Sequence, residues 1–184
     1  MQTIVTFVYF PAAFGSFGAV LEASESELRS VPGVGENSAA LLRLIPAVSR
    51  RSLIGKTPEE EPIRTPSDAG RFFIPRFMYE REEAVLALLL DARSRPIACK
   101  ELSRGVVNAV EINARKLVEM AMERRCSSVI LAHNHLSGVA LPSREDEQST
   151  RKLRQALALV DVDLQDHIVV AGVEYVSLKE SGLI

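Results

Sequence analysis

The sequence predicts an α/β or α+β sandwich built on a mixed sheet, with a short helical region before it. Three observations support this fold class. From residue 83 onward, apolar stretches follow one another in the order β-β-α-β-α-β-β. Before residue 50, the apolar spacing is helical. A stretch rich in proline and glycine separates the two, so we expect a partial helical region over 1–54, a linker over 55–66 and the main domain over 67–184.

Composition limits the class of protein. The 184 residues suffice for one domain with a small appendage, and 47% hydrophobic with 25% charged content is ordinary for a globular protein. The net charge of −2 argues against a protein that coats nucleic acid. The apolar start lacks a basic segment and is broken by Pro11, Gly15 and Gly18, so it matches neither a signal peptide nor a membrane span. We therefore expect a cytoplasmic protein that contacts no membrane.

Two helices are expected in the first part of the chain. Ser24 opens the first, with Glu27 three residues later as a capping box. The stretch VPGVG at residues 31–35 ends it, and the second helix starts at Asn37 or Ser38. One face of this second helix carries Leu41, Leu42, Ile45 and Val48.

The succession of helix, VPGVG and helix resembles a helix-hairpin-helix. In that motif, backbone N–H groups such as those of Gly33 and Gly35 meet a DNA phosphate without sequence preference. A plain helical hairpin with a glycine turn explains the same pattern. One hairpin would contact few phosphates, so the DNA binding expected from it is weak and sensitive to salt.

The boundary of the main domain is expected near residues 55–64. Residues 52–70 hold three prolines and two glycines, which is a linker composition. A helix then starts at Ser67 and runs toward Tyr79, and Pro75 is expected to interrupt it.

The strands and helices of the main domain follow in order. The apolar run 83–91 is interpreted as a strand, because a short partner over 97–103 after an Arg-Pro pair predicts a hairpin. Asn113 is a candidate N-cap for a helix over 114–125, with Leu117, Val118, Met120 and Ala121 facing inward. Two last strands are expected over 162–171 and 173–178, around Gly172. Neither cysteine has CxxC spacing, and both are expected to be small core residues: Cys99 and Cys126.

The stretch between residues 127 and 160 carries the chemistry. Residues 127–132 are expected to form a buried strand, and Leu153, Leu157 and Val160 have the spacing of a helix that starts at Arg144. Residues two apart on a strand point to the same side, so His133 and His135 can direct both imidazoles at one point. Asp146, in the first turn of the following helix, can return a carboxylate to that point. Two imidazoles and one carboxylate are the ligand set of a catalytic zinc whose fourth position is open.

Simpler interpretations of the same residues remain open. Ser143 and Asp146 form a capping pattern, with a serine N-cap and an acid three residues later. A His-x-His pair taken alone is also a weak signal. The capping and metal interpretations are compatible, because Ser143 can cap the helix while Asp146 turns toward a metal.

The stretch LAHNHLSGVALPSRED resembles the JAMM motif of the JAB/MPN metalloprotease-like domains. It is more similar still to the bacterial RadC proteins, which usually read HNHPSG…PSxxD. Leu136 stands where that family normally has proline. The likeness covers residues 64–184 and, more faintly, reaches back to residue 14. It implies the JAB/MPN (cytidine-deaminase-like) fold, and because RadC proteins carry further helices in front, the helical region here is expected to be partial.

The resemblance also implies roles for individual residues. It assigns the two histidines and the aspartate of the motif to a Zn²⁺ ion. It assigns Ser143 to hydrogen-bond the developing oxyanion or the metal-bound water. JAMM proteins place a proton-shuttling glutamate at the start of an early apolar strand, and alignment on the run that ends in Asp91 puts Glu83 there. Glu82 is one step off and would face the other way on a strand; the alternative is that both glutamates are solvated charges.

Two neighbouring residues have a structural interpretation. His167, at the start of a late strand, is expected to be a structural or surface histidine rather than a residue that lies behind the ligands or contacts the substrate. Asn134 points away from the ligands on a regular strand and is expected to hold the motif loop in place.

The resemblance therefore implies a RadC-like JAB/MPN hydrolase in which a zinc-activated water attacks a peptide or isopeptide bond. Such an enzyme is a zinc metallopeptidase that acts on a peptide or protein substrate. RadC proteins are commonly labelled DNA-repair proteins, so the alternative is a DNA-associated module whose metal site is structural or non-catalytic. A scaffold without chemistry is disfavoured by the intact ligand set. The sequence predicts no oligomeric state.

Overall fold

The computed structural model describes residues 10, 12–56, 61–105 and 113–184. Part of the apolar start (residues 1–9 and 11) and part of the expected linker (57–60) lie outside the described residues. The chain divides into two compact units, residues 1–56 and 57–184, and each is described by itself. No helix among the described residues is long and apolar enough to cross a bilayer.

The first unit holds three described helices: α2 (Phe17–Glu22), α3 (Glu25–Arg29) and α4 (Glu36–Lys56). The predicted capping box of α3 is confirmed, because the Ser24 hydroxyl accepts from the backbone N–H of Glu27 and the Glu27 carboxylate accepts from the backbone N–H of Ser24. Phe10, the three helices, the residue after α2 and the turn at residues 31–35 contribute buried side chains to a small core: Phe10, Val20, Ala23, Leu28, Val31, Val34 and Ala39.

Helix α4 differs from expectation at both ends. It starts at Glu36, one residue before Asn37, and continues to Lys56, two residues into the stretch expected as linker. Its predicted apolar face is largely uncovered, since Leu41 is 63% exposed and Val48 is 56% exposed.

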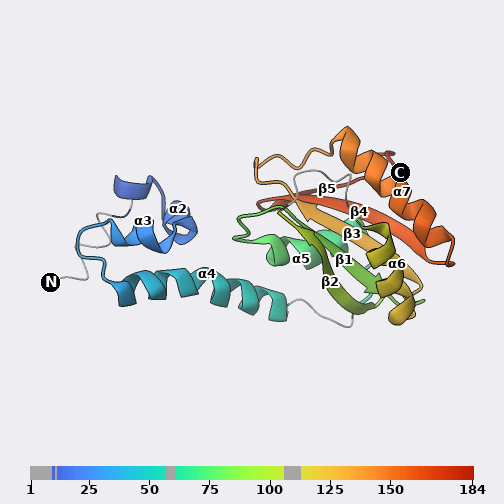
Figure 1. The fold of residues 1–184 in the computed structure, drawn as a ribbon, viewed down its shortest axis with the longest axis horizontal. Coiled ribbons are helices and arrows are strands. Elements are labelled where there is room, and N and C mark those ends of the chain that lie inside the picture. Colours follow the sequence, from blue (N-terminus) through green and yellow to red (C-terminus); the bar gives the residue numbers. More distant parts are fainter. Residues whose placement is uncertain (1–9, 11, 57–60, 106–112) are drawn as a thin grey trace. The chain divides into compact units, whose positions relative to one another are not determined.

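The second unit is built on a five-stranded sheet in the order β2-β1-β3-β4-β5 (Figure 1). Strands β3 and β4 pair in parallel and the other neighbours are antiparallel, which confirms the mixed sheet. The strands occupy Ala84–Leu90 (β1), Pro96–Arg104 (β2), Ser128–Asn134 (β3), Asp163–Ala171 (β4) and Glu174–Ser177 (β5).

Three helices cover the sheet: α5 (Pro66–Phe77), α6 (Ala114–Glu123) and α7 (Arg144–Ala158). The phenylalanines of α5 pack on one face, against residues such as Leu88 and Ile130. Helices α6 and α7 pack on the other face, against residues such as Val129 and Leu131. Alternation along β3 therefore assigns each of its side chains to the α5 face or to the α6–α7 face.

The helix ends follow from local chemistry. Asn113 caps α6 as predicted, and its side chain accepts from the backbone N–H of Lys116. Helix α7 ends at Ala158, two residues before the expected Val160. The prediction that Pro75 interrupts the α5 helix is wrong. Pro75 lies in the last turn, where its missing N–H removes a single bond shortly before the helix ends.

The cysteines behave as predicted: both are free, and Cys126 is buried while Cys99 is partly buried. Burial raises the pKa of the Cys99 thiol to about 11, so it stays protonated and packs as an apolar group.

Candidate metal centre

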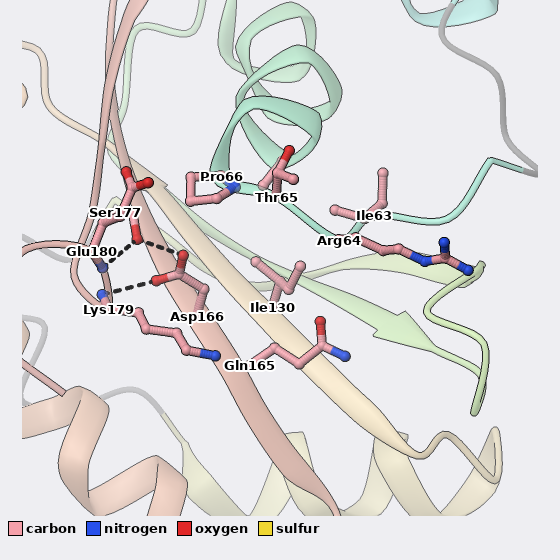
Figure 2. Close-up of a pocket in the computed structure, with 11 residues that line it drawn as sticks. Ile63, Arg64, Thr65, Pro66, Ile130, Gln165, Asp166, Ser177, Lys179 and Glu180 are labelled. Atoms are coloured by element: carbon pink, nitrogen blue, oxygen red, sulfur yellow. Dashed lines mark hydrogen bonds between the residues drawn. The ribbon is translucent and has the colours of Figure 1, made fainter.

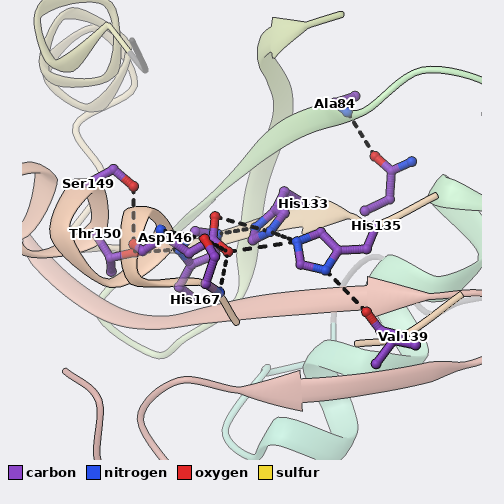
Figure 3. A network of polar contacts seen from close by, with 10 residues as sticks. Ala84, His133, His135, Val139, Asp146, Ser149, Thr150 and His167 are labelled. Atoms are coloured by element: carbon purple, nitrogen blue, oxygen red, sulfur yellow. Dashed lines mark hydrogen bonds and ion pairs between the residues drawn. The ribbon is translucent and has the colours of Figure 1, made fainter. Parts of the chain in front are cut away.

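The two histidines of the motif meet at their Nε2 atoms (Figure 3). Strand β3 extends through Asn134, and the backbone N–H of His135 continues the ladder by donating to the Val170 carbonyl at 2.8 Å. Because the backbone stays extended, His133 and His135 point to the same side, and their Nε2 atoms lie 2.9 Å apart. His133 shares the parity of Leu131, so this side is the α6–α7 face of the sheet.

Helix α7 supplies the carboxylate. Asp146 is the third residue after the N-cap Ser143, and the two form a complete capping box. The Oδ2 atom of Asp146 accepts from the Ser143 backbone N–H at 2.8 Å and from its hydroxyl at 2.7 Å. The other oxygen, Oδ1, lies 3.4 Å from His133 Nε2. Oδ2 therefore caps the helix and also lies 3.7 Å from His135 Nε2, while Oδ1 faces His133.

The three side chains form a group that could hold a metal ion. Ligands about 2.0–2.2 Å from a tetrahedral zinc lie roughly 3.3 Å from one another. The observed separations of 2.9 Å between the imidazoles and 3.4 Å from His133 to the carboxylate are close to that spacing. Two neutral imidazoles and one carboxylate suit zinc and leave one tetrahedral position for another group.

Hydrogen bonds keep the carboxylate ionised. Burial raises the pKa of Asp146, but the hydrogen bonds donated by the backbone N–H and the hydroxyl of Ser143 favour the ionised form, and the pKa lies below its usual range. The side chains of His133 and Asp146 are 8% and 5% exposed, whereas that of His135 is 18% exposed. The group is therefore open on the side of His135.

His167 lies directly behind the first ligand, so of the expected structural or surface histidine only the surface interpretation is wrong. It is fully buried, and its Nε2 lies 2.8 Å from His133 Nδ1. Its other ring nitrogen, Nδ1, lies 2.6 Å from the hydroxyl of Thr150 on α7. Sequence reasoning missed this contact because β4 contains an irregularity that alternation does not predict.

The irregularity is a β-bulge at Gln165. Val129 of β3 pairs with Leu164, but the next residue, Ile130, pairs with Asp166, so Gln165 is left out of the β3–β4 register. Beyond the bulge, His167 lies opposite Leu131 and therefore on the α6–α7 face. Without the extra residue, strict alternation would turn His167 toward α5. Bulges commonly redirect a side chain beside a functional site.

Asn134 holds the start of β1 rather than the motif loop. Its Oδ1 accepts from the Ala84 backbone N–H at 2.8 Å, and its Nδ2 donates to the Glu82 carbonyl at 3.1 Å. The backbone N–H can only donate and the carbonyl can only accept, so the orientation of the amide is fixed. Asn134 is buried, with 4% of the residue exposed, and its side chain fixes the backbone on both sides of Glu83.

Register relates Glu83 to the histidines. Val85 pairs with His133 across the antiparallel β1–β3 ladder, and paired residues share a face. Glu83 lies two residues before Val85, and its carbonyl accepts from the Gly105 N–H at 2.8 Å at the end of β2. Strand β1 starts only at Ala84 and Glu82 lies in a bend, so strand alternation does not extend to either glutamate; Glu83 is half-buried, whereas Glu82 is exposed. The proton-shuttle role of Glu83 stays a prediction.

Two other predicted residues have clear positions. The single hydroxyl proton of Ser143 is donated to Asp146, so the predicted contact with an oxyanion requires that bond to break. In the first unit, Gly33 lies in the turn between α3 and α4 with φ of +86°, where glycine is favoured. Gly35 directly precedes α4. Neither the Ser143 role nor DNA contact by the glycines is tested by these positions.

A separate cavity of about 210 Å³ lies on the α5 side of the sheet (Figure 2). None of the three candidate ligands lines it. Its buried carboxylate, Asp166, already accepts from the Ser177 hydroxyl and from the backbone N–H groups of His167 and Lys179. The cavity therefore plays no part in the candidate metal centre.

Comparison with known proteins identifies the family. Residues 63–183 match the family model described as a RadC-like JAB domain. A UPF0758 protein of Thioalkalivibrio sulfidiphilus is 39% identical over 171 residues, which cover 93% of this chain and 76% of the relative. UPF0758 proteins of Bordetella parapertussis and Nitrosococcus oceani are each 37% identical, over 92% and 94% of this chain and 75% and 77% of the relatives. The chain therefore belongs to the RadC-like JAB domain family, and its mixed sheet with flanking helices agrees with a JAB/MPN-type fold.

Proposed function

We propose that this protein is a zinc-dependent hydrolase that cleaves a peptide or isopeptide bond. The observation that supports the proposal most is the convergence of His133, His135 and Asp146 at the end of β3. The donor set leaves one position open, and the cluster is most exposed at His135. A closed structural zinc site usually has four protein ligands, so three ligands with an open side favour catalysis.

A zinc ion at this site would supply a Lewis acid that lowers the pKa of a water molecule and polarises the scissile carbonyl. The protein's own groups would do the rest. Glu83 would accept the proton of the attacking water and return it to the leaving amine. Asn134 would hold the backbone beside Glu83, and Ser143 would hold the Asp146 carboxylate in place.

An apolar surface beside the open side supports a peptide substrate. The loop between β3 and α7 exposes three apolar side chains, with Leu136 53%, Val139 59% and Leu141 71% exposed. The Val139 carbonyl lies 3.1 Å from His135 Nδ1, so this loop directly borders the candidate ligands. Exposed apolar clusters mark binding surfaces, and this one suits an apolar side chain next to the scissile bond.

Zinc content and two matched variants test the proposal. We expect one zinc per chain in protein purified with the metal, and less than roughly half a zinc per chain would count against the site. Glu83→Gln is expected to lower kcat on peptide or isopeptide substrates by about 10²–10⁴-fold while zinc binding is kept. Glu82→Gln is the control and should retain activity. Equal losses in both variants would contradict the assignment of Glu83.

We also propose DNA contact by the first unit as a second candidate function. It is supported by the glycine turn between α3 and α4, although Glu36 places a negative charge in the first turn of α4. Gly35→Asp would repel a phosphate at this turn, whereas Gly55→Asp adds the same charge at the far end of α4. Binding to a short duplex at low salt should weaken in the first variant alone. Absence of binding by the unaltered protein would refute this function.

A further inference from the structure

The side chains behind His133 form a continuous hydrogen-bonded chain. His133 Nδ1 lies 2.8 Å from His167 Nε2, and His167 Nδ1 lies 2.6 Å from Thr150 Oγ1. Thr150 Oγ1 lies 2.5 Å from the backbone carbonyl of Asp146. Both His167 and Thr150 are fully buried. The chain therefore links one candidate ligand, His133, to the backbone of another, Asp146 (Figure 3).

The Asp146 carbonyl, at the end of these hydrogen bonds, decides which group donates and which accepts at each step. A carbonyl oxygen only accepts, and two oxygens 2.5 Å apart need a proton between them, so the Thr150 hydroxyl donates to Asp146. Thr150 has no second proton, so its oxygen accepts from His167 Nδ1–H. His167 is fully buried and has no carboxylate among the hydrogen-bond partners found for its ring, so a charged imidazolium there would be an unpaired buried charge. Neutral His167 therefore has a bare Nε2, which accepts from His133 Nδ1–H.

With its proton on Nδ1, His133 carries no proton on Nε2, so the lone pair of Nε2 is free to bind a metal. The same logic applies to His135, whose Nδ1 lies 3.1 Å from the Val139 carbonyl and therefore carries the proton. Two bare nitrogens then face each other at 2.9 Å, beside the Asp146 carboxylate. A cation between them removes the repulsion of their lone pairs. The opposite direction of the chain would put a proton on His133 Nε2 and block its use as a ligand.

We propose that Thr150 and His167 are positioning residues that hold His133 in the Nδ1–H tautomer and present its bare Nε2 to the metal. This inference rests on the proposed zinc function. An independent observation supports it: the β-bulge at Gln165 is what places His167 on the ligand side of β4. Groups that receive the second ring N–H of a histidine ligand fix its orientation, and their loss typically lowers metal affinity by about 10–100-fold.

Three variants separate this role from general packing. Thr150→Val keeps the shape and removes the hydroxyl, so zinc affinity in a chelator competition should fall about 10–100-fold. Thr150→Ser keeps the hydroxyl and should bind zinc as the unaltered protein does. Ser149→Ala is the matched control, because the Ser149 hydroxyl donates to the same Asp146 carbonyl at 3.1 Å and has no contact with His167 among the hydrogen bonds found. It should leave the affinity unchanged. Equal affinities in Thr150→Val and Thr150→Ser would overturn the proposal.

The tautomers give a second readout that does not need zinc. Long-range proton–nitrogen correlation spectra of the metal-free protein at neutral pH should show His167 as the Nδ1–H tautomer, and Thr150→Val should alter that signal. An Nε2–H tautomer of His167 in the unaltered protein would refute the relay even if zinc binds. If zinc fails to bind the unaltered protein, the proposed function is lost, and the His167 tautomer still decides between the two directions of the chain.

Discussion

Replacing Asn134 by Asp is expected to destabilise the protein, because it removes one hydrogen bond in a buried site. The introduced carboxylate keeps the acceptor for the Ala84 N–H but presents an oxygen to the Glu82 carbonyl, where Nδ2 now donates at 3.1 Å. The Glu82 carbonyl is only partly buried, so leaving it unpaired costs toward the lower end of about 1–3 kcal/mol. The repulsion between the two oxygens adds to this cost.

Urea unfolding followed by circular dichroism measures the loss. Asn113→Asp is the control, since Asn113 is an exposed N-cap that accepts from the Lys116 N–H, and aspartate caps helices equally well. The control should stay within about 0.5 kcal/mol of the unaltered protein. Because Asn134 bonds on both sides of Glu83, its replacement should also lower kcat. A change of less than about 0.5 kcal/mol in Asn134→Asp would refute the structural role of this amide.

Three further predictions concern caps and packing. Ser143→Ala should cost about 1 kcal/mol of unfolding free energy, and it should weaken zinc binding because Asp146 loses both bonds to the Ser143 hydroxyl, one accepted by its carboxylate and one donated by its backbone N–H; Ser143→Thr should preserve both. A hydrogen bond from the Thr65 side chain lowers the pKa of Asp68 from 3.8 to about 2. The ionised Asp68 therefore stabilises the fold above pH 3.8, and this contribution is lost toward pH 2. Unfolding of Asp68→Asn across that range should lack this dependence. Gly70→Ala should lower the melting temperature, because the added Cβ would lie 2.5 Å from the Tyr175 ring.

The order of strands and helices was predictable because each carries its own local signal. The apolar run around Leu88 is too short for a typical helix and is followed by a hairpin signal, and it forms β1. Asn113 and Ser143 each precede a helix with the chemistry of an N-cap, and both cap as expected. Strand alternation also predicted that His133 and His135 point to one side, and this was correct because β3 stays regular up to these residues.

The supporting residues of the site were not predictable, because their positions depend on pairing between strands. His167 faces His133 only after the bulge at Gln165 shifts the register of β4. Asn134 bonds to residues fifty positions away, at the start of β1. Neither contact leaves a periodic or motif-like signal in the sequence. The sequence signal that could have pointed to Thr150 is its spacing from Asp146, because residues four apart on a helix are neighbours.

Anomalous scattering at the zinc edge, from a crystal of the protein loaded with zinc, tests the central claim most directly. A metal site formed by the end of β3 and the start of α7 predicts one peak per chain within about 2.0–2.2 Å of the ligand atoms. Those atoms are Nε2 of His133, Nε2 of His135 and Oδ1 of Asp146. No peak at this position, or a zinc held by other residues, would contradict the claim.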